Sequence, residues 1–169
     1  MDILVLILRL LHIIGGVFWV GGALAMNFFV APTMRATGDA GKQFAGHLMG
    51  RTQFSQFMMY SGIASIIAGF ILYGIDSNWF TSEWQSSGPG IGFGIGALFA
   101  LVGMATGIMN GSNNRKMGSL GVQIQGKPTP EQAAQLASIQ KQQGWVVPVN
   151  TYSLILSLVF MAIARYLRF

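Results

Sequence analysis

Four long apolar stretches, interrupted by very few charged side chains, constrain this chain more than any other feature. A hydrocarbon core of roughly 30 Å requires about 20 helical residues, and each stretch is about that long or longer. Because unpaired backbone polar groups are prohibitive in lipid, each stretch is expected to be a helix. The predicted spans of this single integral membrane domain, residues 1–169, cover residues 3–33, 54–75, 90–109 and 145–166.

Composition indicates a bilayer rather than water as the solvent. Only 9% of the residues are charged and 52% are hydrophobic, whereas soluble domains carry about 25% charged residues. This balance excludes a disordered chain and an ordinary cytosolic enzyme. The ten basic residues are spread over the ends of the apolar stretches rather than clustered, which argues against a nucleic-acid partner. The chain has no cysteine, so it has no disulfide framework and no Cys-ligated zinc site.

The basic residues predict an orientation in the membrane. Most of them fall in two loops, residues 35–53 and 110–144. By the positive-inside rule, both loops are expected in the cytoplasm and both termini outside, in a bacterial inner membrane. The pattern at residues 129–132 (TPEQ) predicts a short cytoplasmic helix before the fourth span, ended by Gly144. The expected fold is an all-α, antiparallel four-helix membrane bundle.

Small residues mark the helix faces that can pack closely. Gly62, Ser65 and Gly69 share one face of the second span. A stripe within about 60° of arc on the third span holds four glycines: Gly92, Gly96, Gly103 and Gly107. Membrane helices associate at such faces. The stripe therefore predicts packing within the chain, docking of a second copy or a partner membrane subunit, or room for a flat cofactor or lipid.

His12 is the central candidate for chemistry. An ionisable side chain well inside a span is costly, and it indicates function by default. Gly16 and Trp19 follow on the same face, and Arg9 lies one turn nearer the outside. Imidazole is a common axial ligand of haem iron, and an arginine can pair with a propionate. The pattern predicts b-type haem bound by His12, with Arg9, Gly16 and Trp19 forming the site. The alternative is a structural or proton-handling histidine, hydrogen-bonded to a neighbouring helix.

Other potential metal ligands are scattered along the chain. Met161 is a weak candidate for a second axial ligand, one turn nearer the outside than the depth of His12. His47 falls in the first basic loop, where an interfacial side chain or a lipid head-group contact is expected. Ten methionines admit a copper(I) site, but their spread over several depths favours adaptable packing. No two carboxylates share a span, which argues against hydrolytic acid–base chemistry.

The first span carries a family resemblance. Residues 11–22 (LHIIGGVFWVGG) resemble the first-helix pattern of the copper-resistance D-like family of bacterial integral membrane proteins and of the HemJ-type protoporphyrinogen oxidases. Residues 128–134 (PTPEQAA) and 161–167 (MAIARYL), with Asn150, resemble uncharacterised members of the first group. The resemblance implies a four-span bundle. For the HemJ-like branch it also implies haem ligated at His12 and, if the protein is an enzyme, oxidase activity. The third span lacks the lysine of the HemJ pattern.

Three functions therefore stay open. The first is a small haem-binding membrane protein in redox or porphyrin chemistry. The second is a non-catalytic accessory subunit of a larger membrane complex, docked through the third-span stripe, with His12 hydrogen-bonded internally. The third is a copper transport or resistance protein.

Overall fold

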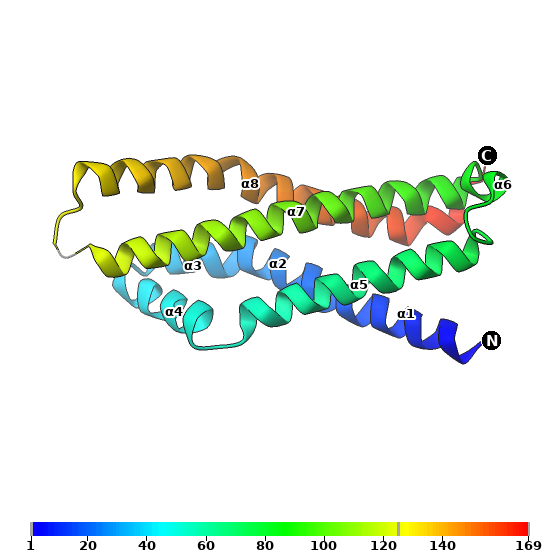
Figure 1. Ribbon diagram of the computed structural model, residues 1–169, viewed down its shortest axis with the longest axis horizontal. Helices are drawn as coiled ribbons and strands as arrows, with labels where there is room; N and C mark the ends of the chain where they lie inside the picture. The colour runs from blue at the N-terminus through cyan, green and yellow to red at the C-terminus, as the bar shows by residue number, and fades with distance from the viewer. Residues whose placement is uncertain (1, 125, 169) are drawn as a thin grey trace.

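The computed structural model describes residues 2–124 and 126–168, which are helical with no strand among them. Four helical rods run antiparallel along the long axis (Figure 1). The elements in chain order are α1 (Ile3–Gly16), the π-helical turn η1 (Val17–Gly21), α2 (Gly22–Ala25), the π-helical turn η2 (Met26–Val30), α3 (Ala31–Ala36), α4 (Asp39–Gly50), α5 (Phe54–Asp76), α6 (Ser82–Gln85), α7 (Gly88–Gln123), α8 (Pro130–Ile163) and the 3₁₀ turn η3 (Ala164–Tyr166). The predicted all-α four-helix membrane bundle is confirmed.

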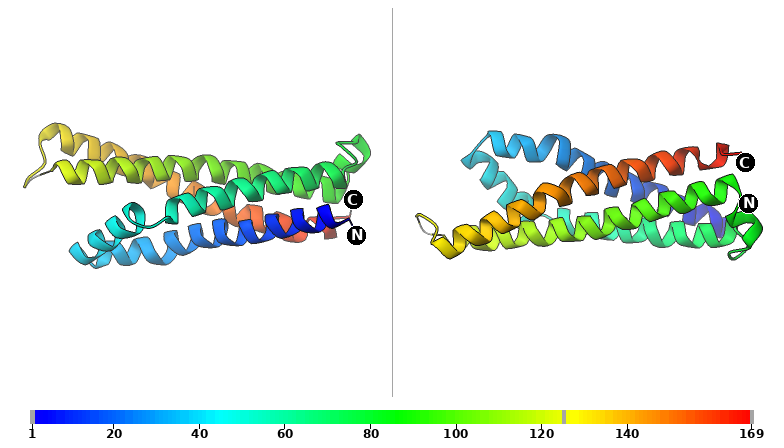
Figure 2. Two further views of the ribbon diagram at one scale, coloured as in Figure 1. Left: turned by 60° about the horizontal axis from the view of Figure 1, so that its bottom comes forward. Right: turned by 90° about the horizontal axis from the view of Figure 1, so that it is seen from above.

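Both chain termini lie at one end of the bundle, here called the terminal end, together with α6 (Figure 1). The turns that follow α3 and α7 lie at the opposite end, here called the hairpin end (Figure 2). The rods form two closely packed pairs, α1 with α5 and α7 with α8. Large apolar side chains such as Ile67, Phe70 and Leu98 are exposed along the rods. All four rods are long and apolar enough to cross a membrane, so lipid is the solvent for this surface.

The first rod is one helix interrupted by two π-helical turns. It runs over Ile3–Ala36, a few residues beyond its predicted end. The Asp2 carboxylate caps it by accepting a hydrogen bond from the backbone N–H of Leu4 at 3.1 Å. Gly38 then turns the chain into α4 with a φ of 58°, a conformation that glycine adopts without steric cost.

The largest differences from the predicted spans are in α7 and α8. The helix of the third span continues beyond residue 109 to Gln123, and the predicted short helix and fourth span are one uninterrupted helix. Thr129 forms the predicted capping box, but Gly144 lies inside α8 instead of ending a helix. The stretch 110–144 is therefore a helical hairpin rather than a loop. The other predicted loop, residues 35–53, likewise contains a helix, α4.

The two helices continue beyond their apolar stretches because their polar portions pack on each other. Gln143 Nε2 donates a hydrogen bond to Asn114 Oδ1 at 2.7 Å, and Leu120 and Ile139 are buried in the same interface region. At 1.5 Å per residue, the 36 residues of α7 measure about 54 Å, against a hydrocarbon thickness of roughly 30 Å. The α7–α8 pair is therefore longer than a membrane is thick.

The glycine stripe of α7 packs against α8. A Cβ atom on Gly103 would lie 2.5 Å from Leu154 Cδ2, and one on Gly92 would lie 2.9 Å from the Cα atom of Ala164. The other glycines of the stripe also face α8 side chains: Gly96 and Gly107. Of the expectations for this stripe, packing within the chain is the one that the structure shows, because α8 and η3 of the same chain lie against it.

A cluster of amide and hydroxyl side chains joins the first rod to the α7–α8 pair. Asn150 Nδ2 donates to the carbonyl oxygen of Gly103 at 2.7 Å, and Asn27 Nδ2 donates to Thr151 Oγ1 at 2.8 Å. Asn150 and Thr151 are buried. The cluster thus satisfies buried polar groups and links three rods.

We expect Asn150→Ala to lower the free energy of unfolding in detergent by about 0.6–1.7 kcal/mol, from the average to the maximum measured for side-chain hydrogen bonds between membrane helices. Chemical unfolding of the single variants and of the Asn27→Ala/Asn150→Ala pair measures the effect. The losses should be less than additive, because both residues belong to one cluster. Strict additivity would show that the two side chains act independently.

The α1 and α5 backbones are in near contact. A Cβ atom on Gly15 would lie 2.8 Å from the carbonyl oxygen of Ser61 and 3.3 Å from Ser65 Cβ. Trp19 is buried one turn farther along, where its indole lies 3.0 Å from a Cβ built on Gly62. Small residues on both helices therefore set the separation of this pair.

Gly15→Ala is expected to destabilise the protein by about 1–3 kcal/mol, since a new methyl group would press on a backbone atom that cannot move aside. Gly21→Ala is the matched control, because no atom lies within 4 Å of a Cβ at that position. Thermal unfolding in detergent compares the two variants. Equal melting temperatures would contradict the close approach of α1 and α5.

Candidate functional site

His12 lies on the face of α1 that packs against α5, and it is half-buried. Its Nδ1 atom lies 2.8 Å from the backbone carbonyl oxygen of Ser65. The Ser65 hydroxyl donates a hydrogen bond to the carbonyl oxygen of His12 at 2.9 Å and lies 3.4 Å from Nδ1. Ser65 therefore contacts both the backbone and the ring of this histidine.

Gly69 makes the contact between the imidazole and α5 sterically feasible. A Cβ atom on Gly69 would lie 2.6 Å from Cε1 and 2.7 Å from Nδ1 of His12. Within α5 the Ser65 carbonyl also accepts the N–H of the residue four positions later, which is Gly69. A carbonyl has two lone pairs, and the missing side chain at Gly69 leaves the second one accessible to the ring.

The hydrogen bond determines which ring nitrogen carries the proton. A carbonyl oxygen only accepts, so Nδ1 is the donor and carries hydrogen. Neutral His12 then has its lone pair on Nε2, and that atom makes no hydrogen bond with any described residue. A metal-binding histidine is held in this same way, with its other nitrogen donating to a carbonyl or carboxylate. The geometry leaves Nε2 free to bind a metal or to accept a proton.

Gly16 and Trp19 lie on the same face as His12, as their spacing predicts. Along α5, His12 meets Gly69, Gly16 meets Ser65, and Trp19 meets Gly62. The small residues of α5 are thus covered by two large side chains of the first rod. These contacts position His12 and Trp19 against α5.

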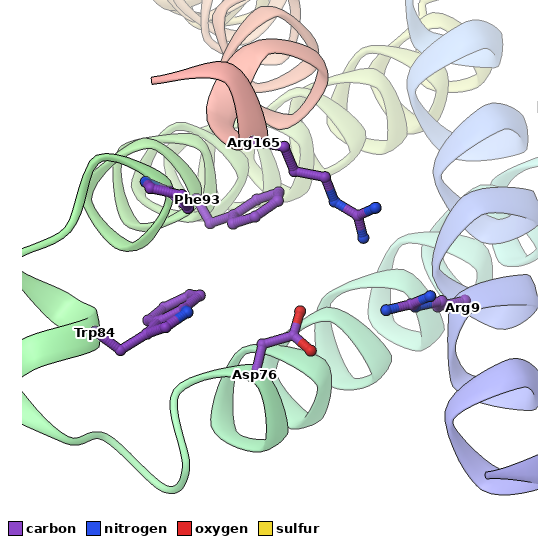
Figure 3. Close-up of a pocket in the computed structure, with 6 residues that line it drawn as sticks. Arg9, Asp76, Trp84, Phe93 and Arg165 are labelled. Carbon is purple, nitrogen blue, oxygen red and sulfur yellow. The ribbon is translucent and has the colours of Figure 1, made fainter. Parts of the chain in front are cut away.

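Arg9 lies one turn nearer the terminal end, where it lines a cavity of about 370 Å³. Figure 3 shows Arg9, Asp76 and Arg165 around this space, with Trp84 and Phe93 on its other side. The charged residues come from three different elements, α1, α5 and η3. The neighbourhood of Asp76 and Arg165 depends on tertiary contacts that no short motif encodes.

The other two candidate ligands lie elsewhere. Met161 is in the α7–α8 interface, where its Cε and Cγ atoms lie 3.1 and 3.4 Å from a Cβ built on Gly96. His47 is exposed on α4, at the hairpin end. No group of three or more His, Cys, Asp or Glu side chains able to hold a metal ion occurs in residues 2–124 and 126–168.

Ser65 and Gly69 are the site residues that the histidine pattern alone does not identify. They lie four residues apart on one face of α5, opposite a polar residue of another span. That arrangement is the signal that could have identified them. In comparisons with family models, curated protein sequences and solved structures, the chain has no match. Its function is therefore argued from the geometry around His12.

Ring ¹⁵N chemical shifts test the assigned tautomer directly. In the His47→Gln variant His12 is the only histidine, so its signals need no further assignment. We expect Nδ1 protonated and Nε2 unprotonated at neutral ring charge, and we expect Gly69→Ala to change both shifts by displacing the ring. A dominant Nε2–H tautomer would contradict the hydrogen bond to Ser65.

Proposed function

We propose that this chain binds a b-type haem within the membrane through Nε2 of His12 and serves in redox or porphyrin chemistry. The observation that supports it is the Nδ1 hydrogen bond to the Ser65 carbonyl, which fixes the ring and leaves Nε2 unpaired. A single imidazole suits haem better than a bare metal ion, because the porphyrin supplies the four equatorial nitrogens. When bound, such a group supplies one-electron transfer chemistry.

The residues around His12 fit an anionic porphyrin. Arg9 is three residues away, about 4.5 Å along the helix, and lines a cavity with Arg165. Guanidinium groups are the preferred partners of carboxylates. In this proposal Ser65 holds the tautomer, Gly69 admits the ring, and Gly16 and Trp19 hold the helix pair. Met161 is given no role, because its side chain fills the α7–α8 interface.

The orientation of the bundle is part of the proposal. Apart from Arg9, Arg165 and Arg168, the basic residues belong to the segments of the hairpin end. The positive-inside rule would place that end in the cytoplasm of a bacterium. The cavity beside Arg9 would then open on the outer side of the inner membrane.

Optical spectroscopy of detergent-purified protein, alone and after incubation with haem, tests this function. We expect a Soret band in the wild type and in His47→Ala, which removes the other histidine. The band should be absent in His12→Ala.

Arg9→Gln should weaken haem binding about fivefold. This is the change in affinity expected when one partly exposed ion pair, worth about 1 kcal/mol, is lost.

Two controls make the result decisive. Gel filtration and thermal unfolding must show that His12→Ala is folded, since it also loses the contact with Ser65. A wild-type protein without a Soret band after incubation with excess haem would overturn the proposal. So would a band of equal intensity in the wild type and in folded His12→Ala.

A further inference from the structure

The cavity at the terminal end, here called the vestibule, brings together three charges that do not pair directly. It is lined by two guanidinium groups, one carboxylate and three apolar rings: Arg9, Asp76, Trp84, Pro89, Phe93 and Arg165. In Figure 3 both guanidinium groups extend into the same space as the Asp76 carboxylate. No ion pair within 4.0 Å joins Asp76 to either arginine.

This separation matters because opposite charges attract strongly beside lipid. Three elements hold the groups around a space of about 370 Å³ instead. An arrangement of this kind suits a polar group between the charges better than a direct salt bridge.

The balance of charge indicates what that group carries. Two guanidinium groups face one carboxylate, so the vestibule has one uncompensated positive charge. One negative charge from a ligand would neutralise it. Arginine presents several N–H donors in a plane, which matches carboxylate and phosphate oxygens. The chemistry therefore favours a monoanionic oxyanion.

The remaining walls favour a ligand with an apolar body. Trp84 is held edge-on against Tyr73, with ring centroids 4.9 Å apart and an interplanar angle of 88°. With Phe93 it forms an aromatic boundary beside the charges (Figure 3). Asp76 and Arg165 are exposed, whereas Arg9 is half-buried. A ligand can therefore enter with its anionic group toward Arg9.

We propose that the vestibule binds an amphiphile through a single carboxylate or phosphodiester group held between Arg9 and Arg165. Asp76 selects against groups with two negative charges. The inference does not require a metal at His12, and it assigns to Asp76 a role that haem binding does not.

Native mass spectrometry of the full, haem-free protein in detergent tests the proposal. The probes are oleate, a carboxylate, and dioleoylphosphatidylglycerol, a monoanionic phosphodiester, with dioleoylphosphatidylcholine as the neutral comparison. We expect at least one monoanion to bind more tightly than phosphatidylcholine. Tighter binding of oleate would identify a carboxylate ligand, and tighter binding of phosphatidylglycerol would identify a lipid head group.

Arg165→Gln should weaken binding of the preferred monoanion by about tenfold or more, the loss expected for a hydrogen bond to a charged group. Arg168→Gln is the matched control, because it removes the same charge three residues away without lining the vestibule.

Asp76→Asn should improve binding of dioleoylphosphatidate, a dianion, relative to the monoanions. A purely structural Asp76 would not produce that change in selectivity.

The proposal is overturned if neither monoanion binds more tightly than phosphatidylcholine, or if Arg165→Gln and Arg168→Gln weaken binding equally. Because no haem is present, these results are independent of the Soret measurement. A protein without a Soret band that still binds a monoanion through Arg165 would refute haem binding and support the vestibule.

Discussion

The near contact between the α1 and α5 backbones is the interaction on which the site depends. In lipid, apolar side chains gain little by leaving the solvent, so helices are held by close packing and by polar contacts. Gly15 lets the two backbones approach, and at that separation the Ser65 carbonyl reaches the ring of His12. The stability of the helix pair and the chemistry of the histidine therefore have the same cause.

The fold and one face of the site could be predicted from the sequence. Long apolar stretches with few charges allow little except membrane helices, because lipid leaves backbone groups no other partner. His12, Gly16 and Trp19 also lie on one face, since helical periodicity places residues four and seven apart together. The α5 residues that pack against this face are Gly62, Ser65 and Gly69, which the sequence shows as a stripe of small residues. Nothing near them in the sequence indicates that they contact His12.

Helix ends and long-range neighbours could not be predicted in the same way. The apolar signal ends where the hydrocarbon ends, whereas α7 and α8 continue because Asn114 and Gln143 pair with each other. The glycine stripe of α7 was compatible with packing inside the chain or against a partner, and its contacts with α8 depend on the tertiary structure. Asp76 and Arg165 are 89 positions apart, so their meeting in one cavity is a property of the tertiary structure.

The two π-helical turns of the first rod affect which neighbouring helices its side chains contact. Each turn accommodates one extra residue, and at about 100° per residue each one changes by about 100° the face that the following residues present, relative to a continuous α-helix. His12, before η1, faces α5, whereas Asn27, within η2, reaches α8. One membrane crossing thus contacts α5 as far as Gly22, which lies against Met58, and contacts α8 farther along through Asn27. Deleting a single residue at either turn would re-aim everything beyond it, even though the hydropathy of the span would hardly change.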